Sequence, residues 1–303
     1  MKAKPKLPDF LILGAAKAGT TALFGALSRH PRVFCSPWKE PRFFAQVGLP
    51  LPDAGQAGTR TRRVVSDEAE YFRLFATCPT GAVAGEASTE YLANHRAPVI
   101  AFDYVPRARL IAILRHPVER AYSQYLHRRH NGREPLDTFE AAWAAEARTG
   151  HRGNAPTRLR GRGFYGQALT RWLEVFPREQ LLILFYEDWL HRPEYVLDRV
   201  WRHISVESIP RPVVRRENVS SRPPRWLWLH RQITRRDNPV RRFARRFLPT
   251  SLRDVVTDSI HRLNLGKAPR LDRGLRAQLA VVYHDDLDRL EILTGRDLTA
   301  WRS

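Results

Sequence analysis

Near the N-terminus, small residues, one lysine and two threonines join an apolar run to a helical pattern. The segment reads Gly14-Ala15-Ala16-Lys17-Ala18-Gly19-Thr20-Thr21. A helix N-terminus offers unpaired N–H groups and the positive end of the helix dipole, so it attracts an anion. Gly19 lets the backbone approach that anion closely. The segment therefore predicts a phosphate-binding loop, whose contacts are Lys17, Ala18, Gly19, Thr20 and Thr21.

This loop departs from the nucleotide-binding pattern G-x-x-x-x-G-K-[ST]. Gly14 and Gly19 have the spacing of that pattern, but Thr20 stands where it has lysine. The lysine of this chain lies within the loop, at Lys17. An ordinary ATPase or GTPase places its lysine on the β- and γ-phosphates. The pattern therefore disfavours such an enzyme, and a magnesium-dependent P-loop kinase stays as an alternative.

A second anion-binding position is predicted at Arg115. This residue follows the apolar run Leu110–Leu114, and α/β sheets bind ligands at the carboxyl ends of their strands. Arginine suits bidentate contact with phosphate. Ser123 lies about two helical turns further along the chain and can add a hydroxyl. The alternative for Arg115 is an ordinary surface salt bridge.

The elements that must position these residues alternate between strands and helices. Four apolar runs predict strands: Phe10–Leu13, Ala82–Gly85, Leu110–Leu114 and Leu181–Phe185. Six patterns predict helices: Thr20–His30, Pro117–His130, Leu136–Arg148, Tyr165–Val175, Glu194–Ile204 and Arg270–Leu293. This order predicts an α/β fold with a mostly parallel central sheet flanked by helices. One domain is expected, with a core over about 8–206 and a helical extension over about 210–303.

The composition narrows the class of protein. The 303 residues include 43% hydrophobic residues, which is ample for a core, and the net charge is +20. Six of the 51 basic residues are lysine and the other 45 are arginine, which indicates either an anionic ligand or arginine-rich codon usage. Two cysteines form no zinc or disulfide pattern. No apolar run is long enough for a membrane span, so a cytoplasmic protein is expected. No metal is expected, because arginines, lysine and backbone dipoles already supply positive charge.

Three blocks of the chain together resemble the sulfotransferases that use 3′-phosphoadenosine 5′-phosphosulfate (PAPS). The likeness is to the branch with the heparan sulfate N- and 3-O-sulfotransferases and their bacterial relatives. The blocks are Phe10–Thr21, Lys39–Phe44 and Leu114–Tyr125, with a weaker match over Gly163–Asp188. The resemblance covers Phe10 to about Val206 and implies a P-loop-like three-layer fold.

The resemblance also implies roles for individual residues. The loop would hold the 5′-phosphosulfate, and Arg115 and Ser123 the 3′-phosphate. Glu40 would be the general base that takes the acceptor's proton, and Lys39 would neutralise sulfuryl charge. Phe43 and Phe44 would form a wall of the acceptor site and raise the pKa of Glu40 by desolvation. The alternative for Glu40 is that it caps a turn at Pro41 or pairs with a basic neighbour.

The chain departs from these relatives at two places. The heparan sulfate enzymes carry a Glu-Lys pair where this chain has Glu86-Ala87-Ser88, so the lysine that helps to hold sulfate or acceptor is missing. Their cysteine-bounded cofactor loop near the C-terminus is also missing. Within Arg215–Arg225, Ser221 and Arg222 are the predicted substitutes for its cofactor contacts.

The sequence therefore predicts transfer of a sulfuryl group from PAPS, leaving adenosine 3′,5′-bisphosphate, to a hydroxyl or amine. The expected acceptor is a carbohydrate, glycolipid or small molecule, with no metal and no nucleic acid involved. A basic C-terminal helix over Arg231–Arg246 predicts peripheral membrane contact. The alternative of another class is a basic module that binds nucleic acid or an anionic membrane through this helix and its nearby aromatic residues.

Overall fold

The computed structural model describes residues 6–49, 64–131, 133–149, 159–209 and 270–303. Its centre is a five-stranded sheet in the order β2-β3-β1-β4-β5, in which every neighbouring pair is parallel. The strands are β1 Phe10–Gly14, β2 Val33–Cys35, β3 Val83–Ala87, β4 Arg109–Leu114 and β5 Leu181–Phe185. The predicted α/β fold with a parallel sheet is therefore confirmed.

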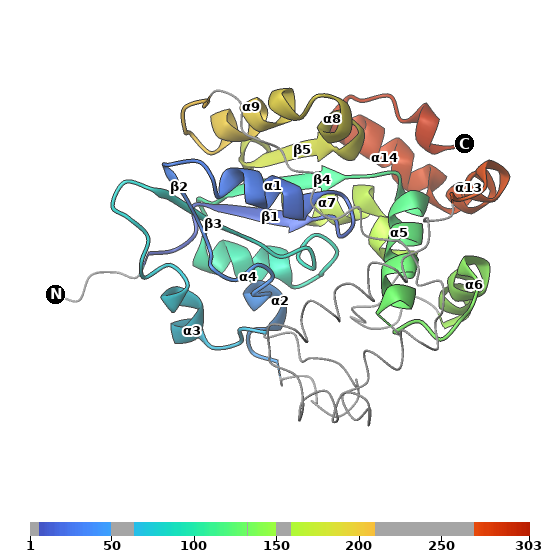
Figure 1. The fold of residues 1–303 in the computed structure, drawn as a ribbon, viewed down its shortest axis with the longest axis horizontal. Coiled ribbons are helices and arrows are strands. Elements are labelled where there is room, and N and C mark those ends of the chain that lie inside the picture. Colours follow the sequence, from blue (N-terminus) through green and yellow to red (C-terminus); the bar gives the residue numbers. More distant parts are fainter. Residues whose placement is uncertain (1–5, 50–63, 132, 150–158, 210–269) are drawn as a thin grey trace, which may run out of the picture.

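Helices enclose the sheet, with α8 and α9 beside the edge strand β5 (Figure 1). The helices of the first half are α1 Thr20–Leu27, α2 Phe43–Gln46, α3 Glu68–Arg73, α4 Ala97–Tyr104, α5 Pro117–His130 and α6 Phe139–Thr149. Those of the second half are α7 Tyr165–Leu173, α8 Tyr186–His191, α9 Pro193–His203, α13 Arg273–Ala280 and α14 His284–Thr294. Short 3₁₀ turns are Gly161–Gly163, Arg178–Gln180, Val281–Tyr283 and Thr299–Trp301.

Local chemistry explains where α5 begins. Pro117 stands at the first helical position, where its missing N–H costs no hydrogen bond. The ring of His116 caps the helix, since its Nδ1 accepts the N–H of Val118 at 3.2 Å. Four basic residues occupy the last turn, at the negative end of the helix dipole. The helix therefore starts directly after β4 and carries Arg115 at its entry.

The structure differs from the sequence predictions in several elements, since the helices α2, α3, α4 and α8 were not predicted. The three-residue strand β2 was missed, because so short a run carries no periodic signal. The single helix expected over Arg270–Leu293 is broken by the 3₁₀ turn Val281–Tyr283. The reason is Tyr283, whose ring is fully buried and whose hydroxyl donates to the carbonyl of Arg160 at 2.8 Å.

The end of the chain packs onto the strand-and-helix core. The carboxylate of Asp286 accepts the backbone N–H groups of Gly166 and Gln167, both at 2.8 Å, at the start of α7. Gly166 has no room for a side chain, since an added Cβ would lie 2.6 Å from the carbonyl oxygen of Asp286. Trp301 is buried against Phe185 of β5. Residues 270–303 therefore share the core of the sheet.

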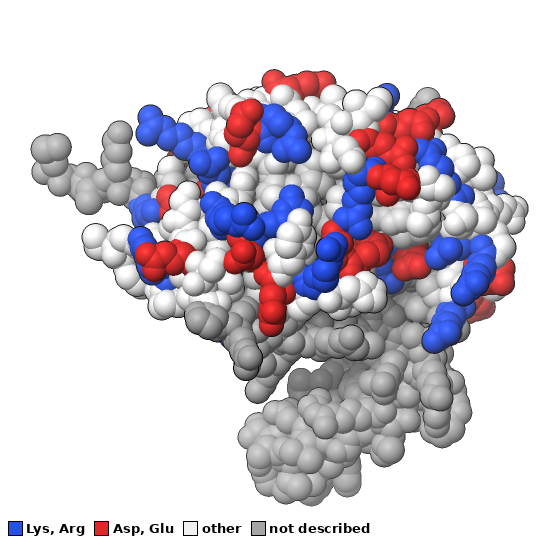
Figure 2. All heavy atoms as spheres, turned by 90° about the horizontal axis from the view of Figure 1, so that it is seen from above, with Lys and Arg blue, Asp and Glu red and all other residues white. Residues whose placement is uncertain are grey.

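Both signs of charge are interspersed on the face shown in Figure 2. Within the described ranges, no helix has the length and apolar character that a membrane crossing requires. The predicted helix over Arg231–Arg246, the cofactor contacts Ser221 and Arg222, and the membrane contact all lie outside the described residues. Those predictions stay predictions.

Candidate active site

The loop after β1 contains two residues whose backbone is in the left-handed region. Gly19 has φ 93° and directly precedes α1, while Lys17 has φ 70°. A Cβ on Gly19 would lie 3.2 Å from the ring of Tyr186 and 3.3 Å from that of Trp189. Ala18 is fully buried, so it can offer a ligand its backbone and not its side chain. The loop therefore presents backbone groups together with the half-buried Lys17.

The two threonines of the loop differ in exposure. Thr20 begins α1 and is 4% exposed, whereas Thr21 is half-buried. Both belong to the first turn, where helix N–H groups have no partner within the helix. Their place at the helix N-terminus agrees with the sequence, and their contact with an anion stays a prediction.

Arg115 lies against the loop. Its Nη1 donates to the carbonyl of Lys17 at 3.3 Å, and its Nη2 pairs with Glu119 at 3.2 Å. Its Nε is buried and has no hydrogen-bond partner within the described part of the chain. Ser123 lies half-buried on α5, as predicted. Arg115 therefore contacts the loop and at the same time forms a salt bridge with Glu119.

Tyr186 also lies beside the loop and Arg115, although no role in the site was predicted for it. The guanidinium carbon of Arg115 lies 4.8 Å from the centre of its ring, and the ring also packs against Gly19. The signal that could have found it is positional: Tyr186 directly follows β5, at the carboxyl end of a parallel strand. The ring forms a half-buried flat surface between loop and arginine.

Glu40 lies at the carboxyl end of the neighbouring strand β3. Its N–H donates to the carbonyl of Ala87 at 2.8 Å, and its φ is 66°. Its carboxylate accepts from the hydroxyl of Thr89 at 2.9 Å, the N–H of Thr89 at 3.2 Å and Nζ of Lys39 at 3.1 Å. Nε of Arg42 lies 3.8 Å away. The carboxylate is therefore fixed in a basic setting.

Thr89 connects Glu40 with the phosphate loop. A Cβ on Gly14, whose φ is 149°, would lie 3.3 Å from the carbonyl oxygen of Thr89 and 3.0 Å from Cβ of Leu92. The same Thr89 holds Glu40 through its hydroxyl and its N–H. Because β1 and β3 are adjacent and strand spacing is about 4.8 Å, base candidate and loop lie side by side.

The expectation for Phe43 and Phe44 is corrected. Both rings are fully buried in the core, where Phe43 stacks on Tyr71 at 4.2 Å, so they do not form a wall of an acceptor site. Burial does raise the pKa of Glu40, but the charges of Lys39 and Arg42 and the hydrogen bonds outweigh it. The net result is a lowered pKa for Glu40, opposite to the prediction, so Glu40 is ionised at neutral pH.

The buried carboxyl group of Glu86 is connected through Ser88 to the turn that contains Glu40. It accepts hydrogen bonds from the hydroxyls of Tyr91 at 2.7 Å, Ser88 at 2.9 Å and Tyr71 at 3.4 Å. The oxygen of Ser88 in turn accepts the N–H of Arg42 at 3.0 Å. Because the hydroxyl of Ser88 donates its hydrogen bond to Glu86, the lone pairs of the same oxygen are left to accept the N–H of Arg42. Glu86 thus orients one of the groups that hold the Glu40 turn.

Replacing Glu86 by Gln is expected to change how stability depends on pH. Burial raises the pKa of Glu86 from 4.5 to about 7 against the hydrogen bonds from Tyr91 and Ser88. Between these values only the folded state holds the proton, so the free energy of unfolding falls as pH rises through this window and is constant above it. The loss is on the order of 3 kcal/mol.

Urea unfolding at pH 5, 6, 7 and 8 measures this effect. Glu86→Gln cannot ionise, so its stability should lack the decline, while the exposed control Glu179→Gln should retain it. Parallel curves for wild type and Glu86→Gln would show that Glu86 does not titrate in this range.

Two further charged residues, Glu90 and Arg162, continue the ion pairs that begin at Glu40 and Arg42. The sequence analysis did not single them out. Glu90 pairs with Nη1 of Arg42 at 3.3 Å and with Nη2 of Arg162 at 3.7 Å. Burial lowers the pKa of Arg162 to about 10, which leaves it charged at neutral pH. Among the described residues, no group of three or more His, Cys, Asp or Glu side chains could hold a metal ion.

Comparison with known proteins agrees with this geometry. Residues 8–210 match the family described as "Sulfotransferase family". Human bifunctional heparan sulfate N-deacetylase/N-sulfotransferase 3 is 30% identical over 211 residues, covering 66% of this chain and 22% of that protein. Human carbohydrate sulfotransferase 15 is 29% identical over 248 residues, covering 66% and 44%. The chain thus spans less than half the length of these relatives.

One solved structure matches along nearly the whole chain. It is a sulfotransferase from Alicyclobacillus acidocaldarius with 27% identity and a TM-score of 0.74, covering 98% of this chain and 100% of that one. The resemblance drawn from the three sequence blocks is confirmed. Since the family match includes the phosphate loop, Glu40, Arg115 and Tyr186, the chain belongs to the sulfotransferase family.

Proposed function

We propose that this protein transfers a sulfuryl group from PAPS to a hydroxyl or amine of a carbohydrate, glycolipid or small-molecule acceptor. The observation that carries this proposal is the link between Glu40 and the start of the loop that contains Lys17. Thr89 holds the Glu40 carboxylate and packs against Gly14, where the loop begins. Within this proposal, Lys17 is the cation for the leaving group and Glu40 is the base for the acceptor.

The residues around the loop fit a nucleotide with two phosphate positions. Gly19 has no room for a side chain beside Tyr186 and Trp189, so its backbone lies close to these rings, and Lys17 stands two residues before it. Arg115 has a buried Nε without a partner among the described residues, so it can still donate to an anion. The ring of Tyr186 offers a flat surface on which the adenine of the nucleotide can stack. When bound, PAPS supplies the sulfuryl group and a phosphate as its leaving group.

The protein contributes positioning and charge rather than a covalent intermediate. Lys17 and the N–H groups at the start of α1 stabilise negative charge near the loop. Glu40 accepts the proton of the acceptor nucleophile, for which its lowered pKa keeps it ready at neutral pH. Lys39, bonded to Glu40, places a further positive charge beside that proton acceptor.

A carbohydrate acceptor is supported by the names of the relatives, which include an N-sulfotransferase and a carbohydrate sulfotransferase. Ala87 stands where the heparan sulfate enzymes carry lysine, which argues for an acceptor other than heparan sulfate. The test is incubation with sulfur-labelled PAPS and acceptor pools, followed by identification of the labelled product. Magnesium-dependent phosphate transfer from ATP, without any sulfuryl transfer, would favour the P-loop kinase instead.

Arg115→Ala is expected to weaken binding of adenosine 3′,5′-bisphosphate by about 10- to 100-fold. The reason is the loss of hydrogen bonds from a charged donor, each worth ~1.5–3 kcal/mol. Isothermal titration calorimetry measures the affinity. The matched control is Arg107→Ala, an exposed arginine at the opposite end of the same strand, which should bind normally. Equal affinity in both variants would remove Arg115 from the nucleotide site.

A further inference from the structure

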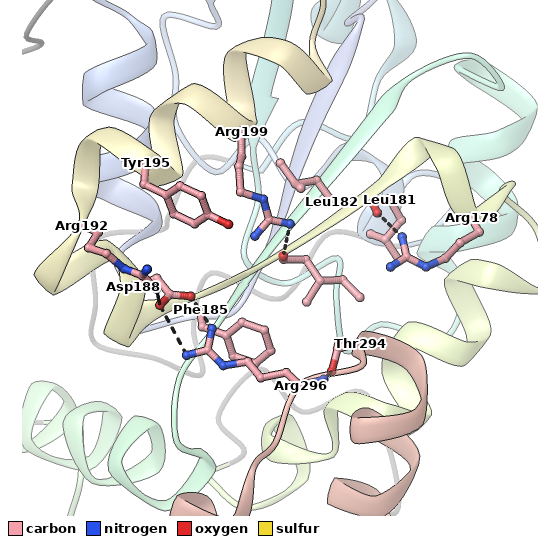
Figure 3. A pocket seen from close by; sticks show the side chains of 11 residues that line it. Arg178, Leu181, Leu182, Phe185, Asp188, Arg192, Tyr195, Arg199, Thr294 and Arg296 are labelled. Carbon is pink, nitrogen blue, oxygen red and sulfur yellow. Dashed lines mark hydrogen bonds and ion pairs between the residues drawn. The ribbon is translucent and has the colours of Figure 1, made fainter.

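A pocket of about 260 Å³ lies outside the candidate active site, along the outer edge of β5. Figure 3 shows its side chains coming from three places: the strand β5 and its entry, the helices α8 and α9, and the end of α14 with the segment after it. Its lining contains four arginines, Arg178, Arg192, Arg199 and Arg296, and one carboxylate, Asp188. The pocket therefore has an excess of positive charge.

The carboxylate does not balance these arginines. Asp188 accepts from Nη2 of Arg192 at 2.9 Å and also pairs with Arg296, so it offsets one of two positive charges. Arg178 and Arg199 form no ion pair with any described residue, and their nearest partners are backbone carbonyls. Three positive charges are thus left over around a small cavity, an arrangement that concentrates anions.

A simpler explanation accounts for only part of this arrangement. β5 is an edge strand, and arginines can cover the free carbonyls of an edge. Arg178 does so well, since its Nη1 donates to Leu181 at 2.7 Å. The distance from Nη2 of Arg199 to the carbonyl oxygen of Ile183 is 3.5 Å, which is long for a hydrogen bond. Edge protection therefore leaves most of the donor capacity of Arg199 unused.

The side chains are also held in place before any ligand arrives. Arg296 is bonded to Asp188, and its guanidinium lies 4.1 Å from the ring centre of Phe185. Tyr195 has Arg192 at 5.1 Å and Arg199 at 5.8 Å from its ring centre, and its hydroxyl points into the pocket (Figure 3). Guanidinium groups fixed in this way lose little freedom when they bind an oxyanion.

We propose that this pocket binds a tetrahedral oxyanion, sulfate or phosphate, either as the free ion or as an ester. It is separate from the acceptor base, because β5 lies three strands from β3, or about 14 Å at ordinary strand spacing. The pocket lies near the proposed nucleotide site, since Phe185 lines the pocket and the next residue, Tyr186, packs against Gly19 of the phosphate loop. The proposal does not depend on the acceptor or on the transfer reaction.

The experiment is a titration of the full chain with inorganic sulfate at constant ionic strength, followed by calorimetry. The phosphate loop also attracts sulfate, so the titration is made in Lys17→Ala as well as in wild type. Sulfate binding is expected to persist in Lys17→Ala and to weaken at least tenfold when Arg178→Gln and Arg199→Gln are added. Loss of all binding in Lys17→Ala alone would overturn the proposal.

The matched control is Arg202→Gln on the same helix. Arg202 lies outside the pocket, is 68% exposed in its side chain and pairs with Asp198, so its loss should not change sulfate affinity. If the double variant fails to fold, Arg199→Lys keeps the charge but not the planar fork, and an unchanged affinity there would contradict the proposal. Parallel titration with glucosamine 6-sulfate distinguishes an ester from the free ion as the better ligand.

Discussion

Glu40→Gln is expected to lower the rate of sulfuryl transfer by ~10²–10⁴-fold, the usual contribution of a positioned general base. The substitution keeps the size of the side chain and can retain the hydrogen bond from the hydroxyl of Thr89. It removes the proton acceptor, because an amide is not basic. Affinity for adenosine 3′,5′-bisphosphate should be unchanged, since Arg115 and the loop are untouched. Initial rates with labelled PAPS, beside calorimetry of nucleotide binding, measure both quantities.

The control for this variant is Glu179→Gln. Glu179 is exposed and lies at the entry of β5, at the opposite end of the sheet from Glu40, so the same change of charge should leave the rate as it is. The pH profile gives a second check. Because Lys39, Arg42 and the hydrogen bonds outweigh burial and lower the pKa of Glu40, the loss of activity on the acid side of the pH profile should lie below the range of an ordinary glutamate and should vanish in Glu40→Gln. Full activity in Glu40→Gln would exclude it as the base.

Lys17→Ala is expected to reduce the rate constant of transfer by ~10²–10³-fold, as the removal of one group that stabilises developing charge does in other enzymes. The lysine lies inside the loop, where its ammonium can face the leaving phosphate. Affinity for the nucleotide should fall less than the rate, because the loop N–H groups and Arg115 remain. Single-turnover kinetics with labelled PAPS separate the rate of transfer from binding.

The backbone of Lys17 makes a second variant informative. Its φ of 70° is unfavourable for most side chains, and glycine adopts it freely. Lys17→Gly should therefore lose the same activity as Lys17→Ala while its unfolding midpoint stays the same or rises. If Lys17→Gly kept the wild-type rate, the loop course and not the ammonium group would matter, and the assigned role of Lys17 would be wrong.

The sequence predicted the elements whose signal is local. The strands β1, β4 and β5 are continuous apolar runs, and α5 begins at a proline directly after β4. The phosphate loop and the position of Arg115 followed from those elements. The strand β2 could not be predicted in this way, because it is formed by pairing with β3, which lies about 50 residues further along.

The properties of Glu40 lay beyond the sequence for a similar reason. The neighbouring Phe43 and Phe44 indicated an apolar setting for the carboxyl group. In the folded chain those rings turn into the core, while Ala87 at the end of β3 and Thr89 just beyond it bind Glu40. A pKa is set by what surrounds a group in space. Tyr186 was likewise missed because its partners, Gly19 and Arg115, are far from it in sequence.

The contacts of Asp286 and Trp301 with the core bear on where the chain can be cut. The family match ends at residue 210, yet the N–H groups of Gly166 and Gln167 depend on an acceptor 119 to 120 positions further on. Without it, each of these N–H groups loses a hydrogen bond to a charged acceptor, worth ~1.5–3 kcal/mol, against a total stability of ~5–15 kcal/mol for a typical protein. The end of the family match and the boundary of cooperative unfolding therefore differ, and the smallest autonomous unit includes residues 270–303.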